Sequence, residues 1–389
     1  MTVTQQGVIT LLRSAITEKS LPLPAEFDLE GALETVQSHH MHALVYDGAV
    51  RCGVDKNCPV MKKLLRGYLM ALLKSEKQVQ AVTELFRIFE ENGIDYMPLK
   101  GSRMKFLYPK PELRMMGDAD ILIRTEQYER IESFLPALGY HPKHESDHEL
   151  VWLSDSLYLE LHKRLIPSYN EDFYDYYGSG WQLAHPETGH RYTMSAEDEW
   201  IFLFTHFSKH FRDGGIGCRH VVDLWVYRNH HPQMDEAYIR AELEKLQLLE
   251  FYENIRALLA AWFEDAAADS KADVITDYIF ASGSWGEALS RTLSIAVRDS
   301  RRSRRAREGK WQYALRIMFP DVNTLRGKYT VLQKRPWLLP LVWVVRPFYK
   351  LFCEPQSLLR HRKHLRAITD EKVDERRELL RYMGIDYRF

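Results

Sequence analysis

A short stretch in the first third of the chain, residues 97–124, constrains the fold more than any other part of the sequence. It reads MPLKGSRMKFLYPKPELRMMGDADILIR. An apolar run ends at Gly101 and Ser102, which predicts a strand, a tight turn and then a helix that Ser102 caps. A second apolar run begins with two carboxylates, Asp118 and Asp120, and predicts another strand. The chain should therefore place a strand-to-helix turn beside a strand that carries two acids.

The alternation within the second run indicates where its side chains point. Asp118 and Asp120 are two residues apart, so on a strand they project from one face, about 6–7 Å from each other. Ala119, Ile121 and Ile123 then point to the opposite face and into a core. At this spacing both carboxylates can reach one or two metal ions.

A third acid is expected on a third strand. Residues 149–153 and 157–163 flank a Ser-Asp-Ser turn, which is typical of a hairpin. In the second strand of this hairpin the leucines face one way, whereas Tyr158, Glu160 and His162 face the other. Glu160 is therefore the candidate to join the two aspartates.

Helical patterns dominate the rest of the chain, so the fold class predicted is α+β, with a small mixed sheet inside a mainly helical chain. Residues 166–190, rich in Tyr, Gly and Pro, suggest a connecting loop. The expected division is an N-terminal helical region (1–75), an α/β core (76–165), a helical domain (166–297) and a basic, aromatic-rich helical region (298–389).

Composition narrows the class of protein. A hydrophobic content of 45% supports a real core and argues against wholesale disorder. The first residues lack a signal-peptide pattern, and the longest apolar run, 337–345, is too short to span a bilayer. The four scattered cysteines, without zinc-knuckle spacing, are typical of a reducing compartment. We therefore expect a cytoplasmic protein, with a place at the membrane periphery as the further option.

Charge is distributed unevenly. Residues 298–368 hold 18 Lys and Arg against 4 Asp and Glu, a balance of +14, so the rest of the chain has a balance of −15 for a net charge of −1. The arginine run at 301–307 is followed by aromatic residues, among them Trp311, Trp337 and Phe348. This mixture fits a solvated helical face, an anionic membrane surface or single-stranded nucleic acid, and all three interpretations stay open.

The three acids favour phosphoryl-group chemistry. Mg²⁺ prefers oxygen ligands and usually takes one or two carboxylates together with substrate phosphates. Glycine at 101 allows a close approach of the backbone to phosphate, and Lys100 and Arg114 could neutralise a triphosphate. Glu160 would complete the metal site or activate an acceptor hydroxyl.

These motifs resemble the uncharacterised nucleotidyltransferase family of the DNA polymerase β-like superfamily. The resemblance rests on Leu99-Lys100-Gly101, Tyr108-Pro109, Arg114, the Asp118-Ala119-Asp120 triplet and Glu160-Leu161-His162, and covers about residues 30–230. It implies a nucleotidyltransferase core, metal binding by Asp118, Asp120 and Glu160, and nucleotide binding by Lys100, Gly101, Ser102 and Arg114.

The reaction expected is Mg²⁺-dependent transfer of a nucleoside monophosphate from a nucleoside triphosphate, ATP among the candidates, to an acceptor hydroxyl, with Mn²⁺ as the alternative ion. The acceptor stays open among a small molecule, a glycan or peptide product, a protein and an RNA end. The competing hypothesis is an inactive binding module of the same fold that docks through its basic C-terminal region. His206 and His210, four apart on a predicted helix, and Arg219 with Asp223 are interpreted as packing or paired residues.

Overall fold

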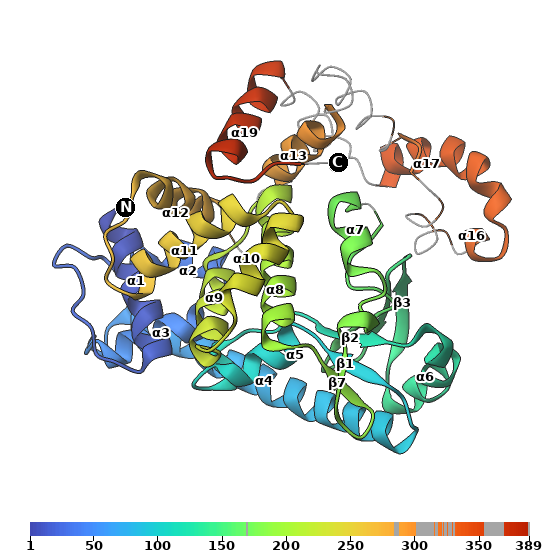
Figure 1. Ribbon diagram of the computed structural model, residues 1–389, viewed down its shortest axis with the longest axis horizontal. Helices are drawn as coiled ribbons and strands as arrows, with labels where there is room; N and C mark the ends of the chain where they lie inside the picture. Colours follow the sequence, from blue (N-terminus) through green and yellow to red (C-terminus); the bar gives the residue numbers. More distant parts are fainter. Residues whose placement is uncertain are drawn as a thin grey trace.

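A mixed sheet with helices on both faces forms one side of the molecule in the computed structural model (Figure 1). The structure describes residues 1–168, 170–283, 288–300, 331–353 and 369–387, and in addition residues 315, 318–320, 322, 325 and 329. The arginine run at 301–307 and Trp311 lie outside these residues. The predicted α+β class is confirmed.

Seven strands form the sheet in the order β3-β4-β5-β2-β1-β7-β6. The strands are β1 (Tyr96–Pro98), β2 (Ala119–Ile123), β3 (His141–Glu145), β4 (Glu149–Leu153), β5 (Tyr158–His162), β6 (His185–Thr188) and β7 (Arg191–Thr193). The pairs β2–β5 and β1–β7 are parallel and the other neighbours are antiparallel, so the sheet is mixed as expected.

The predicted hairpin is present as β4 and β5, which pair in an antiparallel register across the Ser-Asp-Ser turn. The amide of Ser154 donates to the carbonyl of Leu157 at 2.9 Å and closes this turn. The loop expected over 166–190 was wrong, because this stretch contains the helix α7 (Glu171–Tyr177) and the strand β6. Strand β6 reads HPET and is fully exposed, so no apolar alternation announces it.

Helices precede, interrupt and follow the sheet. The N-terminal helices are α1 (Val3–Thr17), α2 (Leu33–Ser38), α3 (His42–Arg51) and α4 (Pro59–Glu91). Short helices connect the strands: α5 (Gly101–Met104), α6 (Tyr128–Phe134) and the 3₁₀ turns η1 (Lys105–Leu107), η2 (Pro111–Leu113), η3 (Thr125–Gln127), η4 (Leu135–Leu138) and η5 (Trp181–Leu183). The helical part contains α8 (Ala196–Asp213), α9 (Cys218–His230), α10 (Glu236–Lys245), α11 (Leu249–Phe263), α12 (Ser270–Ser282) and α13 (Ala288–Ser300).

The two faces of the sheet have different partners. One face packs against α4 and α6 through an apolar cluster that joins Leu85 and Phe89 to Ile121 and Leu159. These residues recur at the 3.6 and 2.0 periods of helix and strand, so each element buries one side. The opposite face carries the polar side chains of β2 and β5 and is turned toward α8. This division leaves the predicted acids on the face that is not filled by the apolar cluster.

The C-terminal segments form two groups, and the first of them packs on the helical part. Helix α19 (Asp370–Tyr382) packs against α13, and Tyr387, just beyond it, is buried against α8, where its hydroxyl donates to Asp213 at 2.7 Å. The elements α16 (Val331–Lys334), η6 (Pro336–Leu338) and α17 (Leu339–Cys353) form a smaller cluster of their own around Leu332 and Val342. In the described part of the chain, no helix has the length and apolar character that crossing a membrane requires.

Candidate active site

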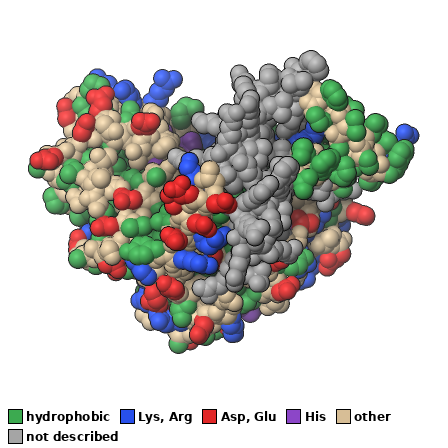
Figure 2. Space-filling view, turned by 90° about the horizontal axis from the view of Figure 1, so that it is seen from above, with side chains coloured by type: hydrophobic (Ala, Val, Ile, Leu, Met, Phe, Trp, Pro, Cys, Tyr) green, Lys and Arg blue, Asp and Glu red, His purple; other side chains and the backbone are tan. Residues whose placement is uncertain are grey.

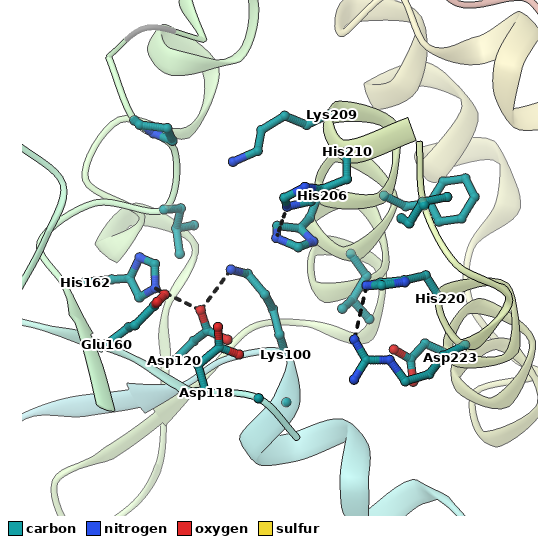
Figure 3. A pocket seen from close by; sticks show the side chains of 18 of the residues that line it. Lys100, Asp118, Asp120, Glu160, His162, His206, Lys209, His210, His220 and Asp223 are labelled. Atoms are coloured by element: carbon teal, nitrogen blue, oxygen red, sulfur yellow. Dashed lines mark hydrogen bonds and ion pairs between the residues drawn. The ribbon is translucent and has the colours of Figure 1, made fainter. Parts of the chain in front are cut away.

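The three predicted acids converge on one cavity between the sheet and the helical part (Figure 3). Asp118 directly precedes β2, Asp120 lies within it, and Glu160 lies on β5. Because β2 and β5 are parallel with Asp120 opposite Glu160, these two side chains are cross-strand neighbours. The cavity has a volume of about 320 Å³ and includes all three carboxylates in its lining.

Asp120 is the most strongly held of the three. Lys100 Nζ and His162 Nε2 both donate to its Oδ1, at 3.0 and 2.9 Å, while none of the described residues donates to its Oδ2. Burial opposes ionisation, but the charge of Lys100 and the hydrogen bond from His162 hold the pKa of Asp120 well below its usual range. Asp120 is therefore a carboxylate with one oxygen still available.

His162 is the positively charged partner of Asp120 and Glu160. Burial by itself would lower its pKa, but its hydrogen bonds to Asp120 and Glu160 raise the pKa to about 9. The distance from Nε2 to Glu160 Oε2 is 3.7 Å. His162 thus compensates two acids at once, while its Nδ1 is buried without a hydrogen-bond partner in the described part of the chain.

Asp118 has the opposite character. Its carboxylate forms no hydrogen bond or ion pair with the residues that the structure describes. Burial, with added repulsion from Asp120 and Glu160, raises the pKa of Asp118 to about 6. The carboxylate is therefore ionised at neutral pH, and the charges of Lys100 and Arg219 offset only part of the cost.

The turn between β1 and α5 brings the backbone close to these acids. Lys100 adopts a left-handed φ of 37°, which is rare outside glycine and orients its side chain toward Asp120. At Gly101 a Cβ atom would lie 3.1 Å from the carbonyl oxygen of Asp118, so the turn packs tightly on the start of β2. Lys100 and Gly101 both line the cavity.

Ser102 has a different place from the one predicted. It lies inside α5 and does not cap it, since Lys100 occupies the N-cap position. Its buried hydroxyl donates to the carbonyls of Leu99, at 2.7 Å, and Asp120, at 3.2 Å. Ser102 does not line the cavity. Its single hydroxyl proton is shared between two backbone acceptors, and these contacts hold the turn against β2.

Arg114 lines the cavity but is already paired. Its guanidinium donates two hydrogen bonds to Asp223 of α9, at 2.8 and 3.0 Å, and the same carboxylate accepts a hydrogen bond of 2.7 Å from Tyr108. The internal pairing expected for Asp223 exists, but with Arg114 as its partner. Arg219, four residues before Asp223, instead donates to the carbonyl of Met115 and lines the cavity.

The wall opposite the acids is basic. Helix α8 contributes His206, Lys209 and His210, and α9 contributes Arg219 and His220. The Nε2 atoms of His206 and His210 lie 3.1 Å apart. Burial and the nearby cations hold the pKa values of His206 and His210 well below the usual value, and that of His220 near 3. These imidazoles are neutral at pH 7 and line a cavity, whereas the sequence alone suggested packing.

The donor atoms suit a divalent cation. Asp120, Glu160 and His162 offer ligand atoms that all lie within 4.8 Å of one another. The three carboxylates lie on one side of the cavity, and the cations Lys100, His162 and Arg219 line the same cavity. Carboxylate oxygens favour hard ions such as Mg²⁺ or Mn²⁺, and His162 would have to lose its proton before it could become a ligand.

A mixed sheet that presents these acids beside the Lys100–Gly101 turn defines the nucleotidyltransferase class. The family model described as "uncharacterised nucleotidyltransferase" matches residues 25–264, which is more than half of the 389-residue chain, and the chain belongs to this family. The family expected from the sequence is thereby confirmed. No curated protein matches the chain, and no solved structure matches it.

Sequence reasoning found the acidic wall and missed most of the basic one. The alternation around Glu160 already placed His162 on the same face, so its role could have been predicted. Lys209 gave no comparable signal, because a single lysine on a predicted helix shows no pairing or spacing pattern. Only the packing of α8 over the sheet brings it to the cavity.

Proposed function

We propose that this protein is a metal-dependent nucleotidyltransferase that transfers a nucleoside monophosphate from a nucleoside triphosphate to an acceptor hydroxyl. The observation that carries the proposal is the convergence of Asp118, Asp120 and Glu160 on one cavity beside Lys100. Membership in a nucleotidyltransferase family supports the reaction class. The acceptor can be a small molecule, a glycan or peptide product, a protein or an RNA end.

Asp118, Asp120 and Glu160 would hold Mg²⁺ or Mn²⁺. The ion, when bound, would neutralise the phosphate oxygens and hold the triphosphate for in-line attack. The carboxylate of Asp118 and the Oδ2 atom of Asp120 are suited to metal binding because none of the described residues donates a hydrogen bond to them. Lys100 would keep Asp120 ionised and add positive charge beside the phosphates.

Glu160 is the candidate general base. It lies on the strand next to Asp120 and faces the same cavity. We propose that its carboxylate accepts the proton of the acceptor hydroxyl while the hydroxyl oxygen bonds to the α-phosphorus. The bond from that phosphorus to the bridging oxygen breaks, and pyrophosphate leaves with the electron pair.

Gly101 and Arg114 are the residues proposed to contact the nucleotide. Gly101 exposes backbone at the cavity, and a side chain there would press on Asp118 and Met116. Arg114 would contribute its charge from within its pair with Asp223. For Ser102 we propose an indirect part, in which its hydroxyl keeps the Gly101 turn fixed to β2.

Calorimetric titration tests the proposal. ATP, GTP, CTP and UTP are each titrated with Mg²⁺ into wild type and the double variant Asp118→Asn/Asp120→Asn. We expect one triphosphate to bind wild type in a metal-dependent manner and the double variant to lose at least about tenfold in affinity, as expected when charge-assisted contacts are removed. The exposed Asp155, on the β4–β5 turn, supplies the control Asp155→Asn. Equal, metal-independent binding by all variants would favour the binding-module hypothesis.

A second proposal concerns the surface of α17 and the anionic membrane. Trp337, Leu341, Val344 and Phe348 follow one another at helical spacing and are exposed, Trp337 by 72% and Phe348 by 61%. Figure 2 shows hydrophobic side chains gathered on this projecting part of the molecule. The surrounding segment carries the excess of +14, so we propose that it docks peripherally on anionic lipid.

Vesicle co-sedimentation tests the docking proposal. Wild type should bind vesicles that contain phosphatidylglycerol more tightly than vesicles of phosphatidylcholine alone, and Leu341→Glu/Val344→Glu should abolish that difference. Leu69→Glu/Leu73→Glu is the matched control, because both leucines are exposed on α4. If wild type instead forms a dimer that only the α17 variant disrupts, the surface is an interface between two copies and the membrane proposal is wrong.

A further inference from the structure

Lys209 is a cation without a partner in the wall opposite the acids. Its side chain leaves α8 and extends into the cavity, as Figure 3 shows. It forms no hydrogen bond or ion pair with any residue in the described ranges. Burial and the charge of Lys100 lower its pKa to about 8, although Asp213, Glu149 and Asp120 act in the opposite direction. A half-buried ammonium without a counter-ion carries a desolvation cost, and an anion would relieve that cost.

The rest of this wall is built to accept an anion. His206 and His210 are neutral and lie beside Lys209 on α8. The hydrogen bond between their Nε2 atoms requires one ring to carry its proton on Nε2 and the other on Nδ1. The pair therefore retains one N–H group, on Nδ1 of the accepting ring, without adding negative charge. Together with Lys209 it offers donors to the cavity, while Asp213 of α8 accepts a hydrogen bond from Tyr387.

The cavity has two ends, and the side chain of Lys209 points toward one of them (Figure 3). Along the sheet order β4-β5-β2-β1, Glu149 of β4 marks one end and Gly101, after β1, marks the other. Arg219 lies at the Gly101 end, because it donates to the carbonyl of Met115, whose neighbour Met116 lies beside Gly101. The amine end of Lys209 lies on the side of the cavity that holds His162, away from His220 and Asp223 (Figure 3), although Lys100 affects its pKa as well as Glu149 does. The acids of β2 and β5 lie between the two ends.

Nucleotidyl transfer needs this kind of division, because donor and acceptor approach the metal-held phosphate from opposite sides. The Gly101 end has the exposed backbone and the cations Lys100 and Arg219, which suit the tripolyphosphate of the donor. The other end has Glu160, the proposed base, near Lys209. An acceptor there would present its hydroxyl to Glu160 and any negative group to Lys209.

We propose that Lys209, with His206 and His210, binds an anionic group, phosphate or carboxylate, of the acceptor, while the tripolyphosphate of the donor occupies the Gly101 end. This assignment rests on the proposed function, and it narrows the acceptor to compounds that carry such a group close to the reacting hydroxyl. Lys209 acts as a binding residue and takes no part in bond making.

Simple anions test the assignment without knowledge of the acceptor. Magnesium tripolyphosphate serves as a base-free probe of the donor tail, and orthophosphate and acetate serve as probes of the acceptor group. Each anion is titrated calorimetrically into the full-length protein, with and without saturating magnesium tripolyphosphate. The variants are Lys209→Met, the charge-retaining Lys209→Arg, and Lys56→Met as a control at an exposed lysine.

We expect orthophosphate or acetate to bind wild type and the Lys56→Met control equally, also when tripolyphosphate is already bound. Lys209→Met should lower the affinity for that anion at least about tenfold, which is the loss expected for a charge-assisted hydrogen bond. It should change the affinity of tripolyphosphate by less than about twofold, since the donor tail occupies the other end. Lys209→Arg should restore most of the anion affinity, which shows that the loss does not come from misfolding.

Three outcomes would overturn the assignment. If tripolyphosphate displaced the small anion, or if Lys209→Met weakened the binding of tripolyphosphate, Lys209 would hold the donor tail. If neither orthophosphate nor acetate bound wild type, the cavity would have no site for an anion of the acceptor. The proposed function fails separately, if tripolyphosphate shows no metal-dependent binding that Asp118→Asn/Asp120→Asn abolishes.

Discussion

Two neighbouring aspartates in this site, separated by one residue, have opposite electrostatic environments. Asp120 receives two hydrogen bonds from cations, whereas Asp118 receives none from the described residues. The pKa of Asp120 is consequently held low and that of Asp118 is raised to about 6. At the scale of single residues, ionised Asp120 is therefore stable, whereas ionised Asp118 is destabilising until a cation binds.

This difference predicts that Asp118→Asn stabilises the metal-free protein at neutral pH. The folded-state pKa of about 6 exceeds the ordinary value of 3.8, so the folded state binds more protons between pH 4 and 6 and loses stability as pH rises through that window. Above pH 6 the full cost remains, at most about 3 kcal/mol by the conversion of a pKa shift into free energy. Asparagine removes that cost.

Urea unfolding in the presence of EDTA, from pH 4 to pH 7.5, measures the effect. The free energy of unfolding of wild type should fall relative to that of Asp118→Asn as pH rises through the window. Asp155→Asn, at the exposed hairpin turn, should follow wild type. If Asp118→Asn were the less stable protein at pH 7, the repulsion argued here would be wrong.

Among the elements, local patterns predicted the acidic half of the site and long-range packing determined the rest. Strand β5 alternates apolar and polar residues, and β2 is an apolar run that begins at the two acids, so both their existence and their facing could be predicted. Strands β3 and β6, which read HPKHE and HPET, are exposed and show no such alternation. Their places depend on pairing with β4 and β7.

The helical wall of the site illustrates the same limit. The sequence predicted α8 but gave no reason to place Lys209 in the same cavity as Glu160, because that position depends on how α8 packs across the sheet. Ser102 was predicted as a helix cap, since serine favours that position. Tertiary contacts overrode the preference: Lys100 begins the helix, and the serine hydroxyl binds two carbonyls in the core.

The link between α9 and the segment before β2 supports a prediction at the element scale. Arg114 and Asp223 are both buried and form a two-bond pair, to which Tyr108 adds a hydrogen bond. Asp223→Ala would leave a buried guanidinium unpaired and should reduce the free energy of unfolding by about 3–5 kcal/mol. Tyr108→Phe, which removes one hydrogen bond from the same carboxylate, should cost only about 1 kcal/mol.

Chemical denaturation of both single variants and of Arg114→Met/Asp223→Leu would measure this link. The double variant removes both charges, so it should recover much of the stability lost in Asp223→Ala. A double variant as unstable as Asp223→Ala, or a Tyr108→Phe loss of equal size, would show that packing and not charge pairing holds α9 to this segment.

At the scale of the whole molecule, the end of the described chain returns to the helix that forms the basic wall. Arg212, the third residue after Lys209, is buried between an ion pair with Asp172 and the ring of Tyr387, whose centroid lies 4.2 Å away. The hydroxyl of Tyr387 also donates to Asp213. The C-terminal end of α8 is thus held in place by a residue about 175 positions further along the chain.

This closure predicts that Tyr387→Ala destabilises the protein although the residue is far from the cavity in sequence. The ring is 1% exposed, and removing such an aromatic side chain costs about 3–5 kcal/mol. Tyr382→Ala, on α19 and 44% exposed, is the matched control and should cost less than about 1 kcal/mol. Because the loss releases the end of α8, orthophosphate binding at Lys209 should weaken under conditions in which the variant is still folded. Urea unfolding together with the anion titration measures both effects, and equal stability of the two variants would show that the C-terminal return does not hold α8.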